Sequence, residues 1–359
     1  MYFRESGPST VLQSASMSRL LKAAGVTAAL AAAGVVVERK MIAAPRYHGP
    51  PSDHFDGRRF HNHRDGWQTE GSFLKWQLTK RPGAWREWID SQAGPAPEGR
   101  VDGGRVRITW VNHATLLVQI DGVNILTDPI WSERCSPVSF AGPKRHRAPG
   151  LQLEDLPKLD AILVSHNHYD HLDLPTLRRL ANTRIYTPLG NSAIIARAGI
   201  FSARDLDWWQ SAKISDRVSI TLVPSQHFCA RAISDRNATL WGGFVISGPS
   251  GHVYFAGDTG WGDHFAQIAA KFQPIRAALL PIGAYLPRWF MKPAHISPAE
   301  AVEAHHVLRA GTSIAMHYGT FRLGDDGELE PAEDLRRALQ ANGNPRFLMI
   351  EHGQGVEIP

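Results

Sequence analysis

The stretch Ile-Leu-Val-Ser-His-Asn-His-Tyr-Asp-His, residues 162–171, decides the fold of this chain. It leads from an apolar segment, predicted to be a strand over residues 161–164, into a polar loop that carries His166, His168, Asp170 and His171. In an extended segment the first two histidines point to the same side and can chelate one ion, whereas the last two residues follow the bend and can serve a second. Because four ligand-type residues rarely meet at this spacing by chance, the stretch predicts a metal site at the end of a strand.

Three further ligand-type residues, His227, Asp258 and His317, follow other predicted strands. Each alone has an ordinary explanation, since a lone strand-end histidine is often structural and Asp-Thr-Gly is commonly a turn. A two-metal site needs about seven or eight protein donors, and the loop and these three residues together supply seven. Imidazole and carboxylate donors favour Zn²⁺, with iron or manganese as alternatives, and the absence of thiolate donors argues against a purely structural zinc. Asp258 stands among glycines and suits a bridging position.

The remaining pattern predicts a layered α/β fold with at least one mixed sheet. The turn Asp121-Gly122 between alternating segments 115–120 and 123–127 is a strong hairpin signal. Other predicted strands alternate with helices, which is typical of such layers. They lie at residues 106–110, 184–187, 218–223, 241–246, 253–256, 277–281, 313–316 and 347–350.

One helix is marked with particular clarity. Ser297 is followed by Pro298 and, three residues on, by Glu300, which is the pattern of a capping box at a helix start. We expect this helix to end before Gly311. Its adjacent pair His305-His306 is expected on the solvent side.

Composition and charge bound the function. The chain has 359 residues, of which 43% are hydrophobic and 20% charged, so a packed core is expected and wholesale disorder is excluded. The net charge of +5 suggests an anionic partner, which could be nucleic acid, a phospholipid surface or a phosphorylated substrate. Cys135 and Cys229 are too few for a disulfide framework, and whether they pair stays open.

The N-terminus differs from the rest in composition. Residues 23–37 carry no charge and stand between basic residues, which is typical of a signal peptide or short anchor, although an Ala-rich helix of a soluble protein is the alternative. We divide the chain into a targeting or anchor-like segment (1–44), an irregular extension (45–104) and a catalytic domain (105–359). Four tryptophans are expected to pin the extension to the core, namely Trp67, Trp76, Trp85 and Trp88. His61-Asn62-His63 is interpreted as a surface loop.

The order of ligand-type residues is similar to that of the metallo-β-lactamase superfamily, and longer strings narrow the resemblance. These strings are residues 126–131, 141–145, 165–173, 207–209, 224–227, 255–260, 281–285 and 287–292. Together they resemble the N-acylphosphatidylethanolamine-hydrolysing phospholipase D family over roughly residues 50–355.

The resemblance implies a metallo-β-lactamase αβ/βα sandwich of two mixed β-sheets flanked by helices. It implies two Zn²⁺ per chain, one held by His166, His168 and His227, the other by Asp170, His171 and His317, with Asp258 shared between them. It also makes Tyr169 and His295 contacts of the phospholipid. We name Asp170 and Asp258 as the catalytic residues.

The implied reaction is hydrolysis of N-acylphosphatidylethanolamine to N-acylethanolamine and phosphatidic acid by a hydroxide that bridges two zinc ions. The expected partners are a phospholipid, a membrane surface and a second copy of the chain. Nucleic acid is not expected, because no strand interleaves aromatic and basic residues. Membrane association, with or without export, is the expected location, and the cytoplasm is the alternative.

Three alternatives remain open at this stage. The chain could hydrolyse another ester, a lactone or a different phosphodiester, it could be a nuclease, or it could be a non-catalytic lipid- or metal-binding scaffold. A scaffold should lack ligands, and none of the seven is missing. The basic run at residues 144–147 fits either anionic lipid headgroups or a solvated loop.

Overall fold

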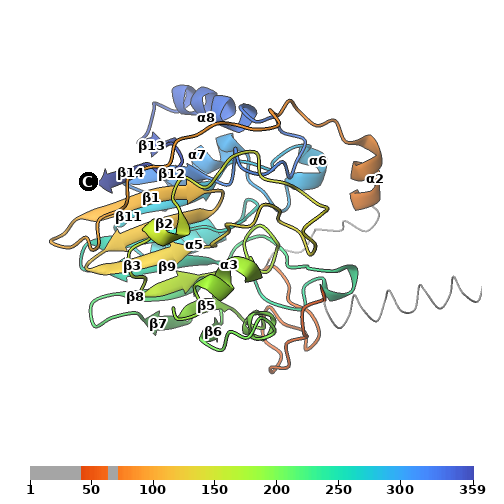
Figure 1. Ribbon diagram of the computed structural model, residues 1–359, viewed down its shortest axis with the longest axis horizontal. Helices are drawn as coiled ribbons and strands as arrows, with labels where there is room; N and C mark the ends of the chain where they lie inside the picture. The colour runs from red at the N-terminus through yellow and green to blue at the C-terminus, as the bar shows by residue number, and fades with distance from the viewer. Residues whose placement is uncertain (1–41, 64–71) are drawn as a thin grey trace, which may run out of the picture.

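The computed structural model describes residues 42–63 and 72–359, and these residues build two seven-stranded sheets (Figure 1). A central core contains side chains from both sheets, among them Ile108 of the first and Phe244 of the second. Helices α3 (Leu174–Arg179) and α4 (Ser192–Ala196) pack against the other face of the first sheet. Helices α5 (His264–Lys271), α7 (Pro298–Leu308) and α8 (Glu330–Ala341) pack against the second. The predicted sandwich of two mixed sheets flanked by helices is confirmed.

The first sheet has the order β14-β1-β2-β3-β4-β5-β6. Its pairs from β14 to β3 are antiparallel and those from β3 to β6 are parallel. Strand β2 is buried on both faces, because Leu116 packs into the central core and Leu117 against the outer helices. The strands are β1 (Val106–Asn112), β2 (Thr115–Ile120), β3 (Val123–Thr127), β4 (Ala161–Leu163), β5 (Ile185–Pro188), β6 (Ala203–Leu206) and β14 (Gly355–Ile358).

The second sheet repeats this plan in the order β13-β12-β11-β10-β9-β8-β7. Its pairs from β7 to β10 are antiparallel and those from β10 to β13 are parallel. Both sheets therefore contain parallel strands whose carboxyl ends can present side chains at one edge. The strands are β7 (Ser211–Lys213), β8 (Ser219–Val223), β9 (Gly243–Gly248), β10 (Gly251–Phe255), β11 (Ile275–Pro281), β12 (Thr312–Met316) and β13 (Phe347–Leu348).

Local signals in the sequence account for several element boundaries. Asp121 and Gly122 both have positive φ, at 49° and 80°, and close the predicted β2–β3 hairpin. The predicted capping box is confirmed at α7, where the Ser297 hydroxyl accepts a hydrogen bond from the Glu300 amide at 3.3 Å. The solvent-side prediction is wrong for His305, which is buried with Nδ1 2.8 Å from the Ser313 hydroxyl of β12, and right for His306.

The N-terminal extension is pinned to the domain by two of the four tryptophans. The indole N–H of Trp76 donates to Asp325 at 3.0 Å, and that of Trp85 donates to the carbonyl of Asp326 at 2.9 Å. The prediction is wrong for Trp88, which is 48% exposed, and Trp67 lies outside the described residues. The extension carries helix α2 (Ser72–Thr79), and a further short helix, α6 (Arg288–Met291), packs beside it.

The targeting-like segment lies outside the described residues. Within the parts that the structure describes, no helix combines the length and apolar character needed to cross a membrane. Cys135 and Cys229 are both buried free thiols.

Candidate metal centre

Five strand ends bring ligand-type side chains together. His113 sits in the turn after β1, the loop 165–171 follows β4, and His227, Asp258 and His317 come after β8, β10 and β12. All seven residues predicted as ligands fall into two four-residue groups, in each of which the donor atoms lie within 4.8 Å of one another. The first group is His166, His168, His227 and Asp258, and the second is His113, Asp170, His171 and His317.

In the first group, ring nitrogens of neutral histidines face one another. Nδ1 of His168 lies 2.9 Å from Nε2 of His166 and 3.3 Å from Nε2 of His227. Burial lowers the pKa of His168 to about 4 and also lowers the pKa of each of the other two. Each neutral ring has one nitrogen without a proton, so the three rings can turn lone pairs towards one cation.

In the second group, carboxylates stand between the rings. Oδ2 of Asp170 lies 3.2 Å from Nε2 of His171 and 3.4 Å from Nε2 of His317. Asp258 reaches the same two rings at 3.2 and 3.1 Å and lies 3.9 Å from two histidines of the first group, so its carboxylate stands between both groups. Burial acts to lower the pKa of His317, but Asp258 and Asp170 outweigh it and raise that pKa to about 9.

Several atoms at this centre lack the partners that buried polar atoms normally have. Among the described residues, those without a hydrogen-bond partner include Nε2 of His171 and of His317, Oδ1 of Asp258 and Nδ1 of His295. The polar neighbours of these atoms are other ligand-type atoms of the centre at 3.1 to 3.9 Å, and a divalent cation among them would satisfy all of them. The nitrogen and oxygen donor set suits zinc, and the residues therefore fit a pair of divalent cations.

Asp128 holds the ligand loop from behind, and sequence reasoning did not identify it as a site residue. Its carboxylate lies 2.6 Å from Nδ1 of His171 and accepts hydrogen bonds from the Ser165 amide at 2.7 Å and the Ser165 hydroxyl at 2.6 Å. That hydroxyl also lies 2.9 Å from Nδ1 of His166. A carboxylate behind a histidine fixes the ring and leaves the other nitrogen free for a metal. The available signal was the position of Asp128 directly after β3, the strand that pairs with β4.

His113 was also missed by sequence reasoning. It has φ 43° in the β1–β2 turn, and its Nε2 lies 2.9 Å from Oδ2 of Asp170. Its ring centroid is 4.0 Å from that of His317, and burial lowers the pKa of His113 to about 3. A neutral ring at this place can hold the Asp170 carboxylate or supply a further donor. The only local signal was a histidine in a tight turn between two apolar strands.

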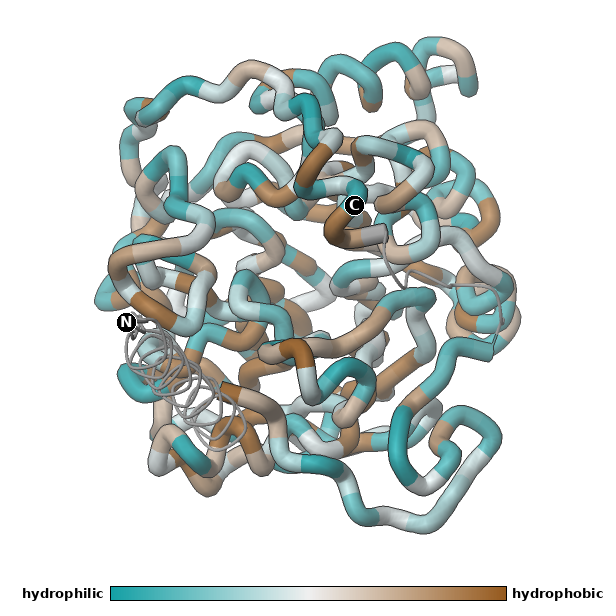
Figure 2. The backbone as a smooth tube through the Cα atoms, turned by 90° about the vertical axis from the view of Figure 1, so that its right-hand side faces the viewer, coloured by the Kyte–Doolittle hydropathy of each residue, from teal (hydrophilic) through white to brown (hydrophobic). Residues whose placement is uncertain are grey.

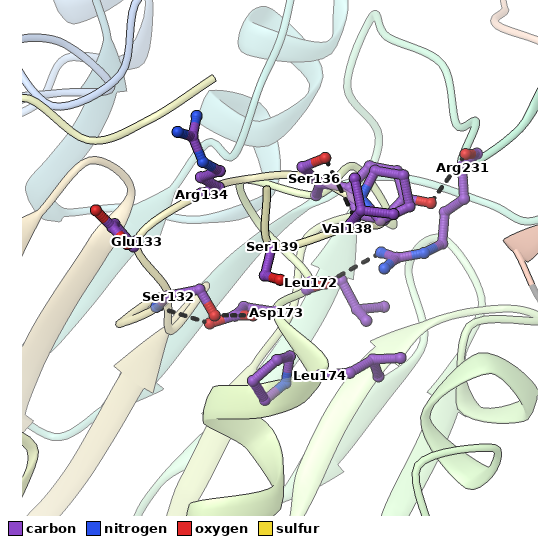
Figure 3. Close-up of a pocket in the computed structure, with 13 residues that line it drawn as sticks. Ser132, Glu133, Arg134, Ser136, Val138, Ser139, Leu172, Asp173, Leu174 and Arg231 are labelled. Atoms are coloured by element: carbon purple, nitrogen blue, oxygen red, sulfur yellow. Dashed lines mark hydrogen bonds between the residues drawn. The ribbon is translucent and has the colours of Figure 1, made fainter. Parts of the chain in front are cut away.

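The two predicted phospholipid contacts, His295 and Tyr169, have different surroundings. His295 stands at the centre, with Nδ1 3.9 Å from Oδ2 of Asp258. Tyr169 is half-buried, and its hydroxyl donates to the carbonyl of Arg231 at 3.0 Å. It lines a cavity of about 230 Å³ beside the loop, in which Figure 3 shows Arg231 at one end and the hydrogen-bonded pair Ser132 and Asp173 near the other.

Arg231 ties the two ends of the ligand loop together. Its guanidinium donates to the carbonyls of Asn167 and Leu172 at 2.8 and 3.0 Å and lies 3.9 Å from the Tyr169 ring centroid. These contacts fix the loop between His166 and His171. Arg231 is therefore a positioning residue for the ligands.

The basic run at residues 144–147 was interpreted either as a contact for anionic lipid headgroups or as a solvated loop. Both interpretations require exposed side chains, and not all of them are exposed. Arg145 is buried, and its guanidinium donates to the carbonyls of Ser132 at 3.0 Å and Ile130 at 3.1 Å. Its charge is used for hydrogen bonds inside the protein, so it is available neither to lipid nor to solvent. Lys144 remains exposed.

A third histidine group lies in the N-terminal extension, where Asp53, His54 and His63 come close together. His54 stacks on Trp208 and makes hydrogen bonds to Asp207 at 2.8 Å and Asp53 at 2.6 Å, one through each ring nitrogen. Burial acts to lower the pKa of His54, but the two carboxylates outweigh it and raise that pKa. Both nitrogens are thus used, as in an imidazolium held between two carboxylates.

The predicted loop at residues 61–63 is confirmed, with exposed His61 and His63. Asn62 between them reaches the metal centre. Its side chain donates to the His227 carbonyl at 2.9 Å and accepts from the His227 amide at 3.1 Å. The extension therefore helps to hold one predicted ligand in place.

Comparison with known proteins agrees with this geometry. The sequence model of the protein family described as the beta-lactamase superfamily domain matches residues 123–318. A Caenorhabditis elegans protein named N-acyl-phosphatidylethanolamine-hydrolyzing phospholipase D 1 is 41% identical over an alignment of 263 residues, which covers 68% of this chain and 74% of that protein. A protein of Saccharomyces cerevisiae named N-acyl-phosphatidylethanolamine-hydrolyzing phospholipase D, mitochondrial, is 34% identical over an alignment of 244 residues, which covers 66% of this chain and 52% of that protein.

A solved structure shares the fold. Igni18, a metallo hydrolase from the archaeon Ignicoccus hospitalis, superimposes with a TM-score of 0.54 at 24% identity and covers 71% of this chain and 99% of its own. The family that the sequence strings predicted is confirmed by the relatives. The chain belongs to the N-acylphosphatidylethanolamine-hydrolysing phospholipase D family of the metallo-β-lactamase superfamily and is a metal-dependent hydrolase.

Proposed function

We propose that the protein is a zinc-dependent phosphodiesterase of phospholipase D type that hydrolyses N-acylphosphatidylethanolamine to N-acylethanolamine and phosphatidic acid. The observation that carries the proposal is the placement of Asp258, whose carboxylate lies within 3.9 Å of two histidines in each of the two donor groups. Similarity to relatives named for this activity supports the choice of substrate. Association with a membrane surface and pairing of two copies belong to the same proposal.

The residues would divide between two zinc ions. His166, His168 and His227 would hold one, Asp170, His171 and His317 the other, and Asp258 both. When bound, two zinc ions supply a water of lowered pKa and positive charge for the phosphate oxygens. Asp170 and Asp258 are the proposed catalytic residues, because each carboxylate lies among the rings that would hold these ions.

Other side chains at the centre would orient a ligand or bind the substrate. Asp128 keeps the Nε2 edge of His171 turned inward by holding Nδ1 at 2.6 Å. Burial lowers the pKa of His295 to about 4, so the ring is neutral at neutral pH and keeps one N–H. This N–H can donate to a phosphate oxygen without repelling nearby cations. Tyr169 remains the second proposed contact of the substrate.

A substrate panel tests the proposal. The protein purified with two equivalents of zinc should release N-acylethanolamine from N-acylphosphatidylethanolamine dispersed in detergent, measured by mass spectrometry. Asp258→Asn serves as the metal-deficient control. Failure on this lipid, together with efficient cleavage of a lactone, a carboxylic ester or a simple phosphodiester, would contradict the proposal and identify the second candidate class.

A further inference from the structure

We infer that helices α2 and α6 form a docking surface for an anionic phospholipid bilayer, a role whose catalytic relevance rests on the proposed function. The α2–α6 surface is defined by four exposed apolar side chains. Phe73, Leu74, Leu78 and Trp289 are 59%, 65%, 79% and 49% exposed. Three of them fall within one eight-residue helix. Clustered exposed apolar residues of this kind mark a surface that meets a partner or a membrane.

Helix α2 does not need Leu74 or Leu78 for its attachment, whereas the ring of Phe73 also lies 5.8 Å from that of Trp76 and 6.4 Å from that of Phe290. Trp76 performs that task, because its ring stacks on Phe290 of α6 at 5.1 Å and its N–H donates to Asp325. Leu74 and Leu78 are one turn apart and therefore share a face of α2, and both are exposed. Their exposure is thus not a by-product of a poorly packed helix.

The charge around the surface favours an anionic partner. Lys75, Lys80 and Arg81 are exposed on or beside α2, and Nζ of Lys75 lies 4.9 Å from the Trp289 ring centroid. Aromatic and apolar side chains interleaved with lysines whose stems lie along them are typical of helices in the bilayer interface. The surface therefore has both components of interfacial binding, apolar area and positive charge.

A cavity beside α2 offers room for a phosphate headgroup. It measures about 420 Å³, and its lining includes Lys80, Lys144 and Arg322 as well as Trp76. One acidic side chain, Asp325, also lines it, but that carboxylate accepts hydrogen bonds from the Trp76 indole and the Arg81 amide. Lys144 is also paired with Glu133 at 2.9 Å, so the cavity keeps a small positive excess from Lys80 and Arg322 over Asp325, which complements an anionic lipid.

A second copy of the chain is the less suitable occupant. A symmetric pair that met through this surface would place the same basic residues on both sides of the interface, where their charges repel. Lysine is also depleted in interfaces between proteins. The same cations would be favourable against an anionic bilayer.

The α2–α6 surface is joined to the metal centre by one short segment. Trp289 of α6 is followed within six positions by His295, and Arg288 donates to the His295 carbonyl at 2.8 Å. The carbonyl of Ala294 in the same segment accepts a hydrogen bond from Nδ1 of His227 at 3.0 Å. Helices α2 and α6 lie at the end of the molecule opposite the C-terminus (Figure 1), the end that faces the viewer in Figure 2. Docking here would present the substrate-binding residue to the lipid.

The first test measures contact at the surface itself in the full chain. Because both native cysteines are buried, a cysteine introduced by Leu74→Cys can be labelled with an environment-sensitive dye. We expect its emission to shift to the blue with vesicles of phosphatidylcholine and phosphatidylglycerol. Phe201→Cys, at a position that is 84% exposed and outside the surface, is the matched control and should not shift. No shift at Leu74→Cys, or equal shifts at both positions, would overturn the inference.

The second test measures the energetic role of the surface. Leu74→Ser combined with Leu78→Ser should weaken sedimentation with these vesicles by at least about tenfold, since interfacial binding scales with buried apolar area. Phe201→Ser should bind as the wild type does. Unchanged vesicle binding, or a variant that loses only self-association in light scattering, would overturn the inference.

These readouts are independent of turnover. If the surface binds vesicles but the protein does not hydrolyse detergent-dispersed N-acylphosphatidylethanolamine, the docking surface stands and the proposed function fails. If the lipid is hydrolysed but Leu74→Cys reports no contact, the proposed function stands and the docking surface fails.

Discussion

The two donor groups of the metal centre differ in charge and in how they are held. The first consists of three neutral histidines and shares one carboxylate, Asp258, with its neighbour. The second has Asp170 of its own, and outer residues support it from both sides, with Asp128 behind His171 and His113 beside Asp170. A position with more negative charge and fixed rings binds a divalent cation more tightly. We therefore expect the second position to fill first and the first to be the exchangeable one.

The largest effect is expected from Asp258→Asn, because this residue is the one that both groups share. We expect loss of metal from both positions and a fall in activity of at least a hundredfold, beyond the roughly 10- to 100-fold typical of outer residues. Metal content by mass spectrometry and lipid turnover check this. Asp216→Asn, an exposed carboxylate, is the control. A variant that still held both ions would show that the groups do not depend on a shared ligand.

Variants in one donor group at a time test directly whether the two positions differ in metal affinity. His168→Gln should remove about one of two bound ions, and the ion that remains should resist a chelator as the tighter one of the wild type does. Asp170→Asn should also leave about one ion, but that ion should be lost at lower chelator concentration. Stepwise chelation followed by metal analysis measures both. The same chelation curve for the two variants would mean that the two positions do not differ as their charges suggest.

A smaller effect is expected from Asp128→Asn, which keeps the shape but removes the charge behind His171. We expect a loss of about 10- to 100-fold in metal affinity at the second position, with a smaller loss at the first through Ser165 and His166. Ser165→Ala removes a hydrogen bond to the same carboxylate and leaves the charge, so its loss should be smaller. If Ser165→Ala were equally damaging, the geometry of the loop rather than the charge of Asp128 would be the important factor.

The ligands could be predicted from the sequence, whereas the residues that support them could not. The seven ligands were predictable because each follows an apolar strand, and strand ends of a mixed sandwich meet at one edge. Asp128 was not predictable, because its role depends on the pairing of β3 with β4. His113 was not predictable, because its role depends on the conformation of a tight turn. The positions of His305 and Arg145 were predicted wrongly for a related reason, since partners such as Ser313, which comes from β12, are set by packing. Strand β14 was not predicted, because its four residues are too few to show an alternating pattern. Its strand conformation depends on pairing with β1.

The smallest effect is expected at the third histidine group, Asp53, His54 and His63. There both ring nitrogens of His54 bond to carboxylates, whereas the histidines of the two donor groups can each offer a nitrogen to a metal ion. The pKa of His54 is raised above the ordinary value of 6.5 that it has in the unfolded chain. The folded state therefore holds the proton more tightly, and the stability gained is fully present below about pH 6.5 and is lost as pH rises through the raised pKa. His54→Gln should cost about 1 kcal/mol at pH 5.5, a modest figure because both carboxylates are exposed enough to be screened. Its difference from wild type in urea unfolding should shrink towards pH 8.5. A difference that stayed constant or grew with pH would mean that His54 is neutral in the folded protein, with a nitrogen open as in the metal centre.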